Sequence, residues 1–475
     1  MNLSELMQGG GAPELAIADL AYASDRVTPG ALFFCVPGFR SDGHDHAPDA
    51  VARGAAALVC ERPLSLGVPE VLVPDVRAAM GPLAARFFGH PTRELRVVGI
   101  TGTNGKTTTA FLVRALLEAG GLRTGLLGTV KSVVGGREEP VERTTPEAID
   151  LQRLFRRMLD GGDAACAIEV SSHALELRRA DGIEHFARVF TNLTQDHLDF
   201  HPTLEHYFLA KRRLFAGGAG ASIVNVDDPY GRRIADEIAG ATTFAIDSPA
   251  DFRARAVSFD TAGSSFTCES PDGRIELKTR LPGRFNVQNA LAAVAVARTF
   301  DIDAATIASA LAGAQRVPGR FEPVDEGQAF AVLVDYAHTP DSLENVLRAA
   351  RTLTSGRLHV VFGAGGDRDR GKRPLMGRAA AAFADRAIVT SDNPRSEDPE
   401  AIVDEVMIGA PEAEREVDRA RAIASAIETA APGDVVVIAG KGHEQGQELA
   451  GGRKQPFDDV AVSREALRAA LGVAP

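Results

Sequence analysis

The sequence is poor in the features that mark secreted, membrane-spanning and nucleic-acid-binding proteins. Four cysteines occur in 475 residues (Cys35, Cys60, Cys166 and Cys268), with no C-x-x-C pair, which excludes a disulfide scaffold and favours a reducing compartment. No apolar run approaches the roughly eighteen residues that a membrane span needs. The net charge of −12 argues against a nucleic-acid-binding face, which is basic. The opening MNLSELMQGG lacks a basic stretch followed by an apolar one, so we expect no secretory signal and a cytoplasmic protein.

What the chain does contain is a repeated alternation of apolar strands and helices. Runs such as RVVGI, AACAIEV, AVLVDYA and DVVVIAGKG are continuous apolar segments followed by polar residues, with Ala-rich helical patterns between them. This alternation predicts an α/β protein with parallel sheets. A chain of 475 residues is too long for one core, and the changes in composition predict three domains, at 1–90, 91–321 and 322–475.

A phosphate-binding loop opens the second predicted domain. VVGITGTNGKTTTA combines a buried strand, a Gly-rich turn and a helix that starts with Lys106 and Thr107. Backbone N–H groups at such a turn favour phosphate oxygens, the lysine reaches the β- and γ-phosphates, and the threonine hydroxyl suits Mg²⁺. The generic G-x-x-x-x-G-K-[ST] pattern requires glycine at the position of Ile100, so the match to it is imperfect.

Later loops offer ligands for a magnesium–phosphate group. Glu169 ends an apolar strand in AIEVSSHAL, and Asp196, His197 and Asp199 follow another in FTNLTQDHLDFH. Lys211 comes next, in the helical pattern HYFLAKRRLF. Each residue alone is more often a hydrogen-bonded bystander, but open parallel sheets bind ligands at the carboxyl ends of their strands. Together they predict a site beside the phosphates.

Six ordered segments, TGTNGKTT, EVSSHAL, TNLTQDHLDFH, NVQNALAA, RVPGRFE and DYAHTP, resemble the Mur ligase family. These are ATP-dependent amide-forming ligases of peptidoglycan precursor synthesis, and their phosphate loop has the shifted form seen here, which removes the objection raised by Ile100. The resemblance covers essentially the whole chain. It implies a central phosphate-loop ATPase domain between an N-terminal uridine-nucleotide-binding α/β domain and a C-terminal Rossmann-like domain. It also implies an acyl-phosphate intermediate, Mg²⁺, small-molecule substrates and a monomer.

The resemblance assigns roles to the matching positions. ATP is expected at Gly102, Thr103, Asn104, Gly105, Lys106, Thr107, Thr108, Asn289, Arg320, Asp335 and His338. Catalysis is expected from Lys106, Glu169, His197 and Lys211, and metal ligation from Thr107, Glu169, His197 and Lys211, the last as a carbamate. An ammonium repels a cation, whereas a carbamate is an anion that can position one.

The first domain resembles the uridine-nucleotide site of the family member that adds the third peptide residue to UDP-N-acetylmuramoyl-L-alanyl-D-glutamate. The matching positions in this domain are Ser24, Ser41, Asp42, Gly43 and His44. In the second domain, Thr144, Thr145, Ser171 and Arg179 match further contacts to the sugar-peptide. Asp25 and Leu177 depart from the usual arginine and glutamine, which puts the contacts at those two positions in doubt.

The segment DNPR resembles the signature of members that add meso-2,6-diaminopimelate, whereas members that add L-lysine lack its arginine. Diaminopimelate carries a carboxylate and an ammonium at its distal end, and Arg395 can pair bidentately with that carboxylate. With lysine bound, the guanidinium would lose its partner, which is costly. The matching amino-acid site is Arg368, Asp392, Asn393, Pro394, Arg395, Gly440 and Glu444, and Gly446 replaces a frequent tyrosine.

Three alternatives remain open at the level of sequence. A folylpolyglutamate synthase shares the phosphate-loop machinery, although the TTPE, DNPR and GKGHE segments and the extra N-terminal domain speak against it. A nucleotide-binding regulator or simple ATPase would keep the fold without ligation, but would need no second metal. A kinase acting on a hydroxyl would leave a stable phosphorylated product.

Overall fold

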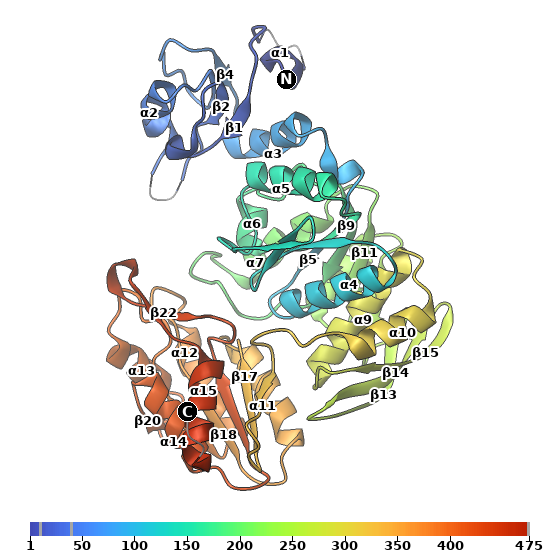
Figure 1. Cartoon of the computed structure of the whole chain (residues 1–475), viewed down its shortest axis with the longest axis vertical. Coiled ribbons are helices and arrows are strands. Elements are labelled where there is room, and N and C mark those ends of the chain that lie inside the picture. Colours follow the sequence, from blue (N-terminus) through green and yellow to red (C-terminus); the bar gives the residue numbers. More distant parts are fainter. Residues whose placement is uncertain (9–11, 39–40, 473–475) are drawn as a thin grey trace. The chain divides into compact units, whose positions relative to one another are not determined.

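The computed structural model describes residues 1–8, 12–38 and 41–472, and the chain folds into two compact units. The first comprises Met1–Thr101, Gly121–Arg188 and Ala210–Ala221, and the second comprises Gly102–Gly120, Val189–Leu209 and Ser222–Pro475. Strands and helices alternate along both units, which confirms the predicted α/β class (Figure 1). Within the described ranges, every helix falls short of the length and apolarity that crossing a membrane would require.

The first unit contains two groups of parallel strands. Strands β1 to β4 form a four-stranded parallel sheet in sequence order. Strands β5, β9 and β6 are parallel neighbours, and β7 and β8 extend β6 in antiparallel fashion. Alternate residues of β2 face opposite cores, Leu32 toward α3 and Phe33 toward α2, as a buried strand requires. The elements are α1 (Leu3–Leu6), β1 (Asp19–Ala21), β2 (Ala31–Phe34), α2 (Ala47–Ala52), β3 (Ala57–Cys60), β4 (Glu70–Leu72), α3 (Val76–Phe87), β5 (Arg96–Thr101), β6 (Thr124–Leu127), β7 (Ser132–Val134), β8 (Arg137–Glu139), α5 (Ala148–Asp160), β9 (Ala165–Glu169) and α6 (Ser172–Glu176).

The second unit begins with the helix that follows the phosphate loop. Helix α4 (Lys106–Ala119) packs against α9 (Arg284–Thr299), whose alanine-rich sequence allows close contact. Helices α9 and α10 (Ala304–Gly313) lie along a sheet in which β13 joins parallel β12 to antiparallel β14 and β15 (Figure 1). Three elements have residues in both units: β10 (His185–Phe190), α7 (Leu204–Arg212) and β11 (Ala221–Asn225). The other elements here are α8 (Pro229–Glu237), β12 (Thr242–Ala245), β13 (Phe252–Asp260), β14 (Gly263–Ser270) and β15 (Gly273–Thr279).

A six-stranded sheet of order β16-β17-β21-β18-β19-β20 forms the remainder of the second unit. All neighbours are parallel except β16 and β17. Val437 of β21 faces the core under α11, α12 and α13, and Ile438 faces the core under α14 and α15, so helices cover both faces of the sheet. The elements are β16 (Glu322–Val324), β17 (Ala331–Asp335), α11 (Pro340–Thr352), β18 (Leu358–Phe362), α12 (Lys372–Phe383), β19 (Arg386–Val389), α13 (Pro399–Met407), β20 (Glu414–Arg415), α14 (Arg419–Glu428), β21 (Val435–Ala439), β22 (Gly446–Glu448), β23 (Lys454–Pro456) and α15 (Asp459–Leu471).

Candidate active site

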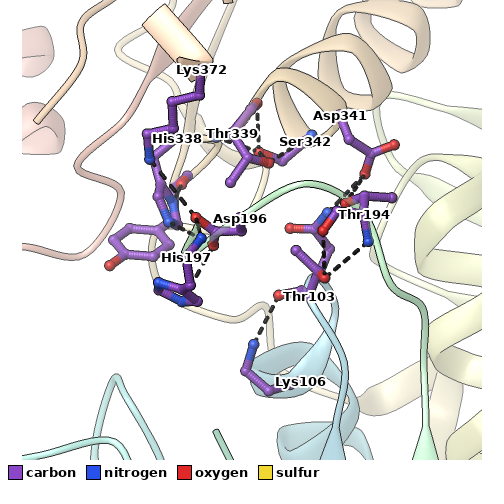
Figure 2. Close-up of polar contacts among 12 residues, drawn as sticks. Thr103, Lys106, Thr194, Asp196, His197, His338, Thr339, Asp341, Ser342 and Lys372 are labelled. Atoms are coloured by element: carbon purple, nitrogen blue, oxygen red, sulfur yellow. Dashed lines mark hydrogen bonds and ion pairs between the residues drawn. The ribbon is translucent and has the colours of Figure 1, made fainter. Parts of the chain in front are cut away.

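The phosphate loop runs from the end of β5 to the first residue of α4, as the sequence predicts. Gly105 precedes α4 with φ +87°, and a Cβ there would lie 2.3 Å from Oδ1 of Asn289, so both conformation and space require glycine. Nζ of Lys106 donates to the carbonyl oxygen of Gly102 (2.9 Å). It also donates to the carbonyl oxygen of Thr103 (2.8 Å) (Figure 2). An ammonium beside a Gly-rich loop at a helix N-terminus suits the binding of phosphate.

Side chains from the segments before and after β17 hydrogen-bond to this loop and to the first turn of α4. Nδ2 of Asn104 donates to Oδ2 of Asp341 (2.8 Å), in the first turn of α11. Nη2 of Arg320 donates to Oγ1 of Thr107 (3.1 Å), and its guanidinium lies 4.3 Å from the ring centroid of Tyr336. The remaining predicted ATP residues nearby belong to the loop, to α4 or to the packed helix α9: Gly102, Thr103, Gly105, Thr108 and Asn289.

Asp335 ends β17, and His338 follows it in the next loop. The buried carboxylate of Asp335 accepts from the backbone N–H groups of Phe321 (2.7 Å) and Ala337 (2.8 Å). Burial raises the pKa of Asp335 to about 6, against the lowering effect of Arg320 and these hydrogen bonds. Nδ1 of His338 lies 2.8 Å from a backbone carbonyl oxygen and therefore carries the proton, and burial lowers the pKa of this ring.

Asp196 is the centre of a cluster of cationic and titratable groups. Its carboxylate lies 3.4 Å from Nε2 of His197, 3.9 Å from Nε2 of His338 and 3.9 Å from Nζ of Lys372 (Figure 2). Burial alone would raise the pKa of Asp196, but the charges of these three groups lower it well below its usual range. His197, a predicted metal ligand, has φ +55°, so the backbone turns sharply where its ring projects.

Two other predicted metal ligands belong to the first unit. Glu169 is buried at the end of β9, where Oε1 accepts from the N–H of Thr129 (2.7 Å) and Oε2 from its hydroxyl (3.2 Å). These two donors hold the carboxylate in one orientation, and carboxylate oxygens are the kind of ligand that Mg²⁺ prefers. Lys211 is buried near the end of α7. Among the residues that the structure describes, no three His, Cys, Asp or Glu side chains gather into an all-protein metal cage.

The loops after β18, β19 and β21 meet at one rim of the C-terminal sheet, as the sequence predicts. Nη1 of Arg395 donates to the carbonyl oxygen of Gly366 (2.8 Å), which joins the first two loops. Nδ2 of Asn393 donates to Oε2 of Glu444 (2.9 Å), which joins the second and third. Arg395 has φ +52°, a conformation typical of a tight turn. The other predicted residues of this rim are Arg368 (exposed), Pro394 (buried) and Gly440 (φ +121°).

A buried lysine lies beneath the rim. Nζ of Lys441, with its side chain fully buried, contacts carboxylate oxygens of Asp392 (3.3 Å) and Glu444 (3.2 Å) and Oδ1 of Asn393 (2.9 Å). Burial alone would raise the pKa of Asp392, but Lys441 and Arg419 lower it. Asp392 is therefore an ionised group inside the rim, with Lys441 as its partner.

Arg419, at the start of α14, holds the same rim from behind. It forms a fully buried bidentate pair with Asp459 of α15 (2.8 and 2.7 Å). The guanidinium also donates to the carbonyl oxygens of Ala439 (2.9 Å) and Ser391 (3.4 Å), at the ends of the loops that carry Gly440 and Asp392. The last helix thus supports the backbone of the predicted amino-acid site.

The predicted uridine-nucleotide residues of the first domain lie in short, well-bonded turns of the first unit. His44 is buried, accepts from the N–H of Glu61 through Nε2 (2.9 Å) and contacts Oδ1 of Asp42 through Nδ1 (2.6 Å). A Cβ at Gly43 would lie 2.5 Å from a backbone nitrogen, so the loop requires glycine. Asp42 and His44 therefore shape the loop. Of the other two residues, Ser24 hydrogen-bonds Asp49 and Ser41 contacts His46 (2.6 Å).

Arg179, one of the predicted sugar-peptide residues of the first unit, belongs to a charged cluster centred on Glu147. Its buried carboxylate lies 2.9 Å from Nε of Arg179, and Arg77 and Arg143 also contact it. Three guanidinium groups for one carboxylate leave excess positive charge, which suits an anionic substrate. The companion residues are Thr144, which contacts Thr129 (3.1 Å), Thr145, which donates to the carbonyl oxygen of Glu169 (2.9 Å), and Ser171, which caps α6.

Several residues of these networks were not predicted. Lys441 lies within GKGHE and Asp341 directly after DYAHTP, so inspection of every charged residue in those motifs would have found them. Lys372 lies four residues after Arg368 in GGDRDRGKRP, so its place near a predicted site residue is a weaker indication of the same kind. Glu448 pairs with Arg395, and Arg419 pairs with Asp459. No motif points to either residue, because their partners lie 53 and 40 residues away in the chain.

Fold and loop together define a nucleotide-binding α/β protein of the phosphate-loop class. Family models for the Mur ligase middle domain, the Mur ligase glutamate ligase domain and the Mur ligase family catalytic domain match residues 100–297, 319–442 and 17–88. The chain belongs to the Mur ligase family, with its three-domain α/β fold.

Individual relatives match over nearly their whole length. The chain is 47% identical to a UDP-N-acetylmuramoyl-L-alanyl-D-glutamate–2,6-diaminopimelate ligase of Geobacillus thermodenitrificans (97% of this chain, 96% of the relative). It is 49% identical to the protein of that name from Streptomyces coelicolor (96% and 93%). A solved structure of a ligase of the same name is similar with a TM-score of 0.71 and 34% identity, and 99% of each chain is covered.

Proposed function

We propose that the chain is an ATP-dependent, ADP-forming ligase that adds meso-2,6-diaminopimelate to the D-glutamate of UDP-N-acetylmuramoyl-L-alanyl-D-glutamate. Relatives named for this substrate pair support the reaction. The observation that carries the choice of amino acid is the rim on which Asn393, in the loop of Arg395, donates a hydrogen bond to Glu444. A guanidinium and a carboxylate on one rim are complementary to a distal carboxylate and ammonium.

ATP binds at the loop that precedes α4, with Lys106 and Thr107 on its phosphates and Asn289, Arg320, Asp335 and His338 around the nucleotide. Lys106 exchanges its two carbonyl acceptors for phosphate oxygens. A carboxylate oxygen of D-glutamate attacks the γ-phosphorus, the bond to the bridging oxygen breaks, and ADP leaves. The amine of diaminopimelate then attacks the acyl carbon, phosphate leaves with the C–O electron pair, and the nitrogen loses a proton. The chain's part is to position these groups and balance their charge.

Mg²⁺ fits the residues available for it. Bound with ATP it needs only one or two protein oxygens besides phosphate and water, and it neutralises charge on the phosphoryl group. Thr107 and Glu169 offer such oxygens, and His197 and carbamylated Lys211 are the proposed ligands of a second ion. Glu169 supplies carboxylate oxygens, the ligand type that Mg²⁺ prefers, and its hydrogen bonds from Thr129 hold the group in place.

Ser24, the loop of Ser41 to His44, Thr144, Thr145, Ser171 and Arg179 form the proposed site for the UDP-sugar dipeptide. We propose domain boundaries at about residues 90 and 321, where the composition of the sequence changes. All proposed ligands come from one chain, so we propose a monomer. We also propose that the enzyme acts in the cytoplasm, where ATP is available.

The test is ADP release measured with each substrate omitted in turn. The ligase requires both the UDP-sugar dipeptide and diaminopimelate, and hydroxylamine traps the acyl phosphate as a hydroxamate. ADP formed from ATP alone, unaffected by either substrate, would identify an ATPase. A phosphorylated product that hydroxylamine cannot capture would identify a kinase. Use of L-lysine as readily as diaminopimelate would refute the proposed specificity alone.

A further inference from the structure

The strand β22 binds the predicted arginine loop along its length. Nε2 of Gln447 donates to the carbonyl oxygen of Asp392 (2.8 Å), and the N–H of Glu448 donates to Oδ1 of Asn393 (2.9 Å). The N–H of Arg395 donates to the carbonyl oxygen of Glu448 (3.0 Å). The DNPR turn is therefore held by a strand more than fifty residues away in the chain.

Glu448 also holds the side chain of Arg395. Its Oε2 accepts from Nε of the guanidinium at 2.9 Å, while Nη1 donates to the carbonyl oxygen of Gly366 at 2.8 Å. The arginine side chain is 18% exposed and the glutamate side chain 38%. A guanidinium fixed at two of its three nitrogens has lost most of its rotamer freedom before a ligand arrives. Among the residues that the structure describes, no hydrogen bond engages Nη2, so its N–H groups can donate to a carboxylate.

We propose that Glu448 is a positioning residue that sets the specificity of the amino-acid site, an inference that rests on the proposed function. The carboxylate aims Arg395 so that its Nη edge receives the distal carboxylate of the incoming amino acid. It also balances the charge of Arg395, as Asp392 and Glu444 balance the charge of Lys441 beneath the rim. A zwitterionic distal end keeps this balance, whereas the distal ammonium of lysine adds an unmatched charge.

The test compares Glu448→Ala and Glu448→Gln in the full chain, by ADP release at varied diaminopimelate, ATP and L-lysine. Glu448→Ala is expected to raise KM for diaminopimelate about tenfold, with kcat and KM for ATP within about twofold of the parent. Its preference for diaminopimelate over lysine falls correspondingly. Glu448→Gln restores most of the affinity, because its amide oxygen still accepts from Nε.

Glu414→Ala is the matched control, since Glu414 pairs with Arg386 (2.6 Å) at the opposite end of β19. It is expected to leave KM for diaminopimelate unchanged. An unchanged KM in Glu448→Ala would overturn the proposal, as would a lowered one, which would mean that Glu448 competes with the ligand for Arg395. If Glu448→Ala fails to fold, Glu448→Gln is compared with Glu414→Ala instead. A KM for diaminopimelate that is tenfold or more higher in Glu448→Gln would then refute the expectation that an acceptor for Nε at this position is enough to position Arg395. A parent without diaminopimelate-dependent ADP release would refute the proposed function instead.

Discussion

Replacing Lys441 by methionine tests whether the buried ammonium holds the amino-acid rim together. Methionine keeps the length and apolar volume of the stem but removes the charge that contacts Asp392, Asn393 and Glu444. Asp392 is then left ionised in a site where its side chain is 7% exposed. Breaking a buried ion pair by removing one partner typically costs about 3–5 kcal/mol.

The lower end of that range applies here. Arg419 continues to act on Asp392, and the side chain of Glu444 is 32% exposed and can rehydrate. We therefore expect a loss of about 3 kcal/mol, which lowers the melting temperature of a domain of this size by roughly 6–12 °C. Calorimetry of the C-terminal transition measures it, with Lys454→Met, which removes an exposed lysine of β23, as the control.

The pH dependence of stability tests independently whether the unpaired carboxylate of Asp392 causes the loss in Lys441→Met. The pKa of Asp392 is lowered in the folded chain, so its contribution to stability is present above its unfolded value of about 4 and is lost as pH falls through the lower folded value. The deficit of Lys441→Met should therefore be full at neutral pH and shrink below about pH 4. Adding Asp392→Asn to the variant should recover part of the loss. A shift below about 2 °C, or one independent of pH, would refute this account.

Three further outcomes are expected. Arg395→Lys keeps the charge but loses the bidentate fork, so kcat/KM for diaminopimelate should fall about 10²-fold with ATP binding unchanged; a fall below threefold contradicts the assigned role. Asp341→Ala removes the acceptor for Asn104 and should weaken ATP binding about fivefold by titration calorimetry, whereas equal affinity would show that the loop needs no support from α11. Burial raises the pKa of Asp335 to about 6 from 3.8, so its contribution favours folding below about pH 4 and declines by up to about 3 kcal/mol as pH rises to 6. Asp335→Asn should flatten that slope in pH-dependent melting, and an unchanged slope would assign it to other groups.

Local pattern was enough to predict the strands and the places where they end. Val437 and Ile438 are both apolar because helices cover both faces of the C-terminal sheet, and such runs are visible in sequence. Parallel strands bring their carboxyl ends to one edge, so the meeting of the loops of Arg395 and Glu444 could also be predicted. The glycine before α4 was predictable for the same reason, since the loop is a local structure.

Pairings between distant segments could not be predicted in this way. Glu448 meets Arg395, and Asp341 meets Asn104, only because the tertiary fold places their segments together. The hydrogen-bonding partners of individual side chains were equally unpredictable: the sequence suggested Asp392 and His44 as ligand contacts, whereas in the structure they contact Lys441 and Asp42 of the chain itself. The pattern of residue types in the sequence showed which loops carry charged side chains, while tertiary packing decides which of these charges form pairs.

The pair between Arg419 and Asp459 has a consequence for the order in which the protein matures. During synthesis the segments around Ser391 and Ala439 leave the ribosome before Asp459 does, so the guanidinium that joins them lacks its fully buried counter-ion until α15 emerges. A nascent chain would therefore form its nucleotide loop well before it could recognise an amino acid, and its two capabilities would arise at different times.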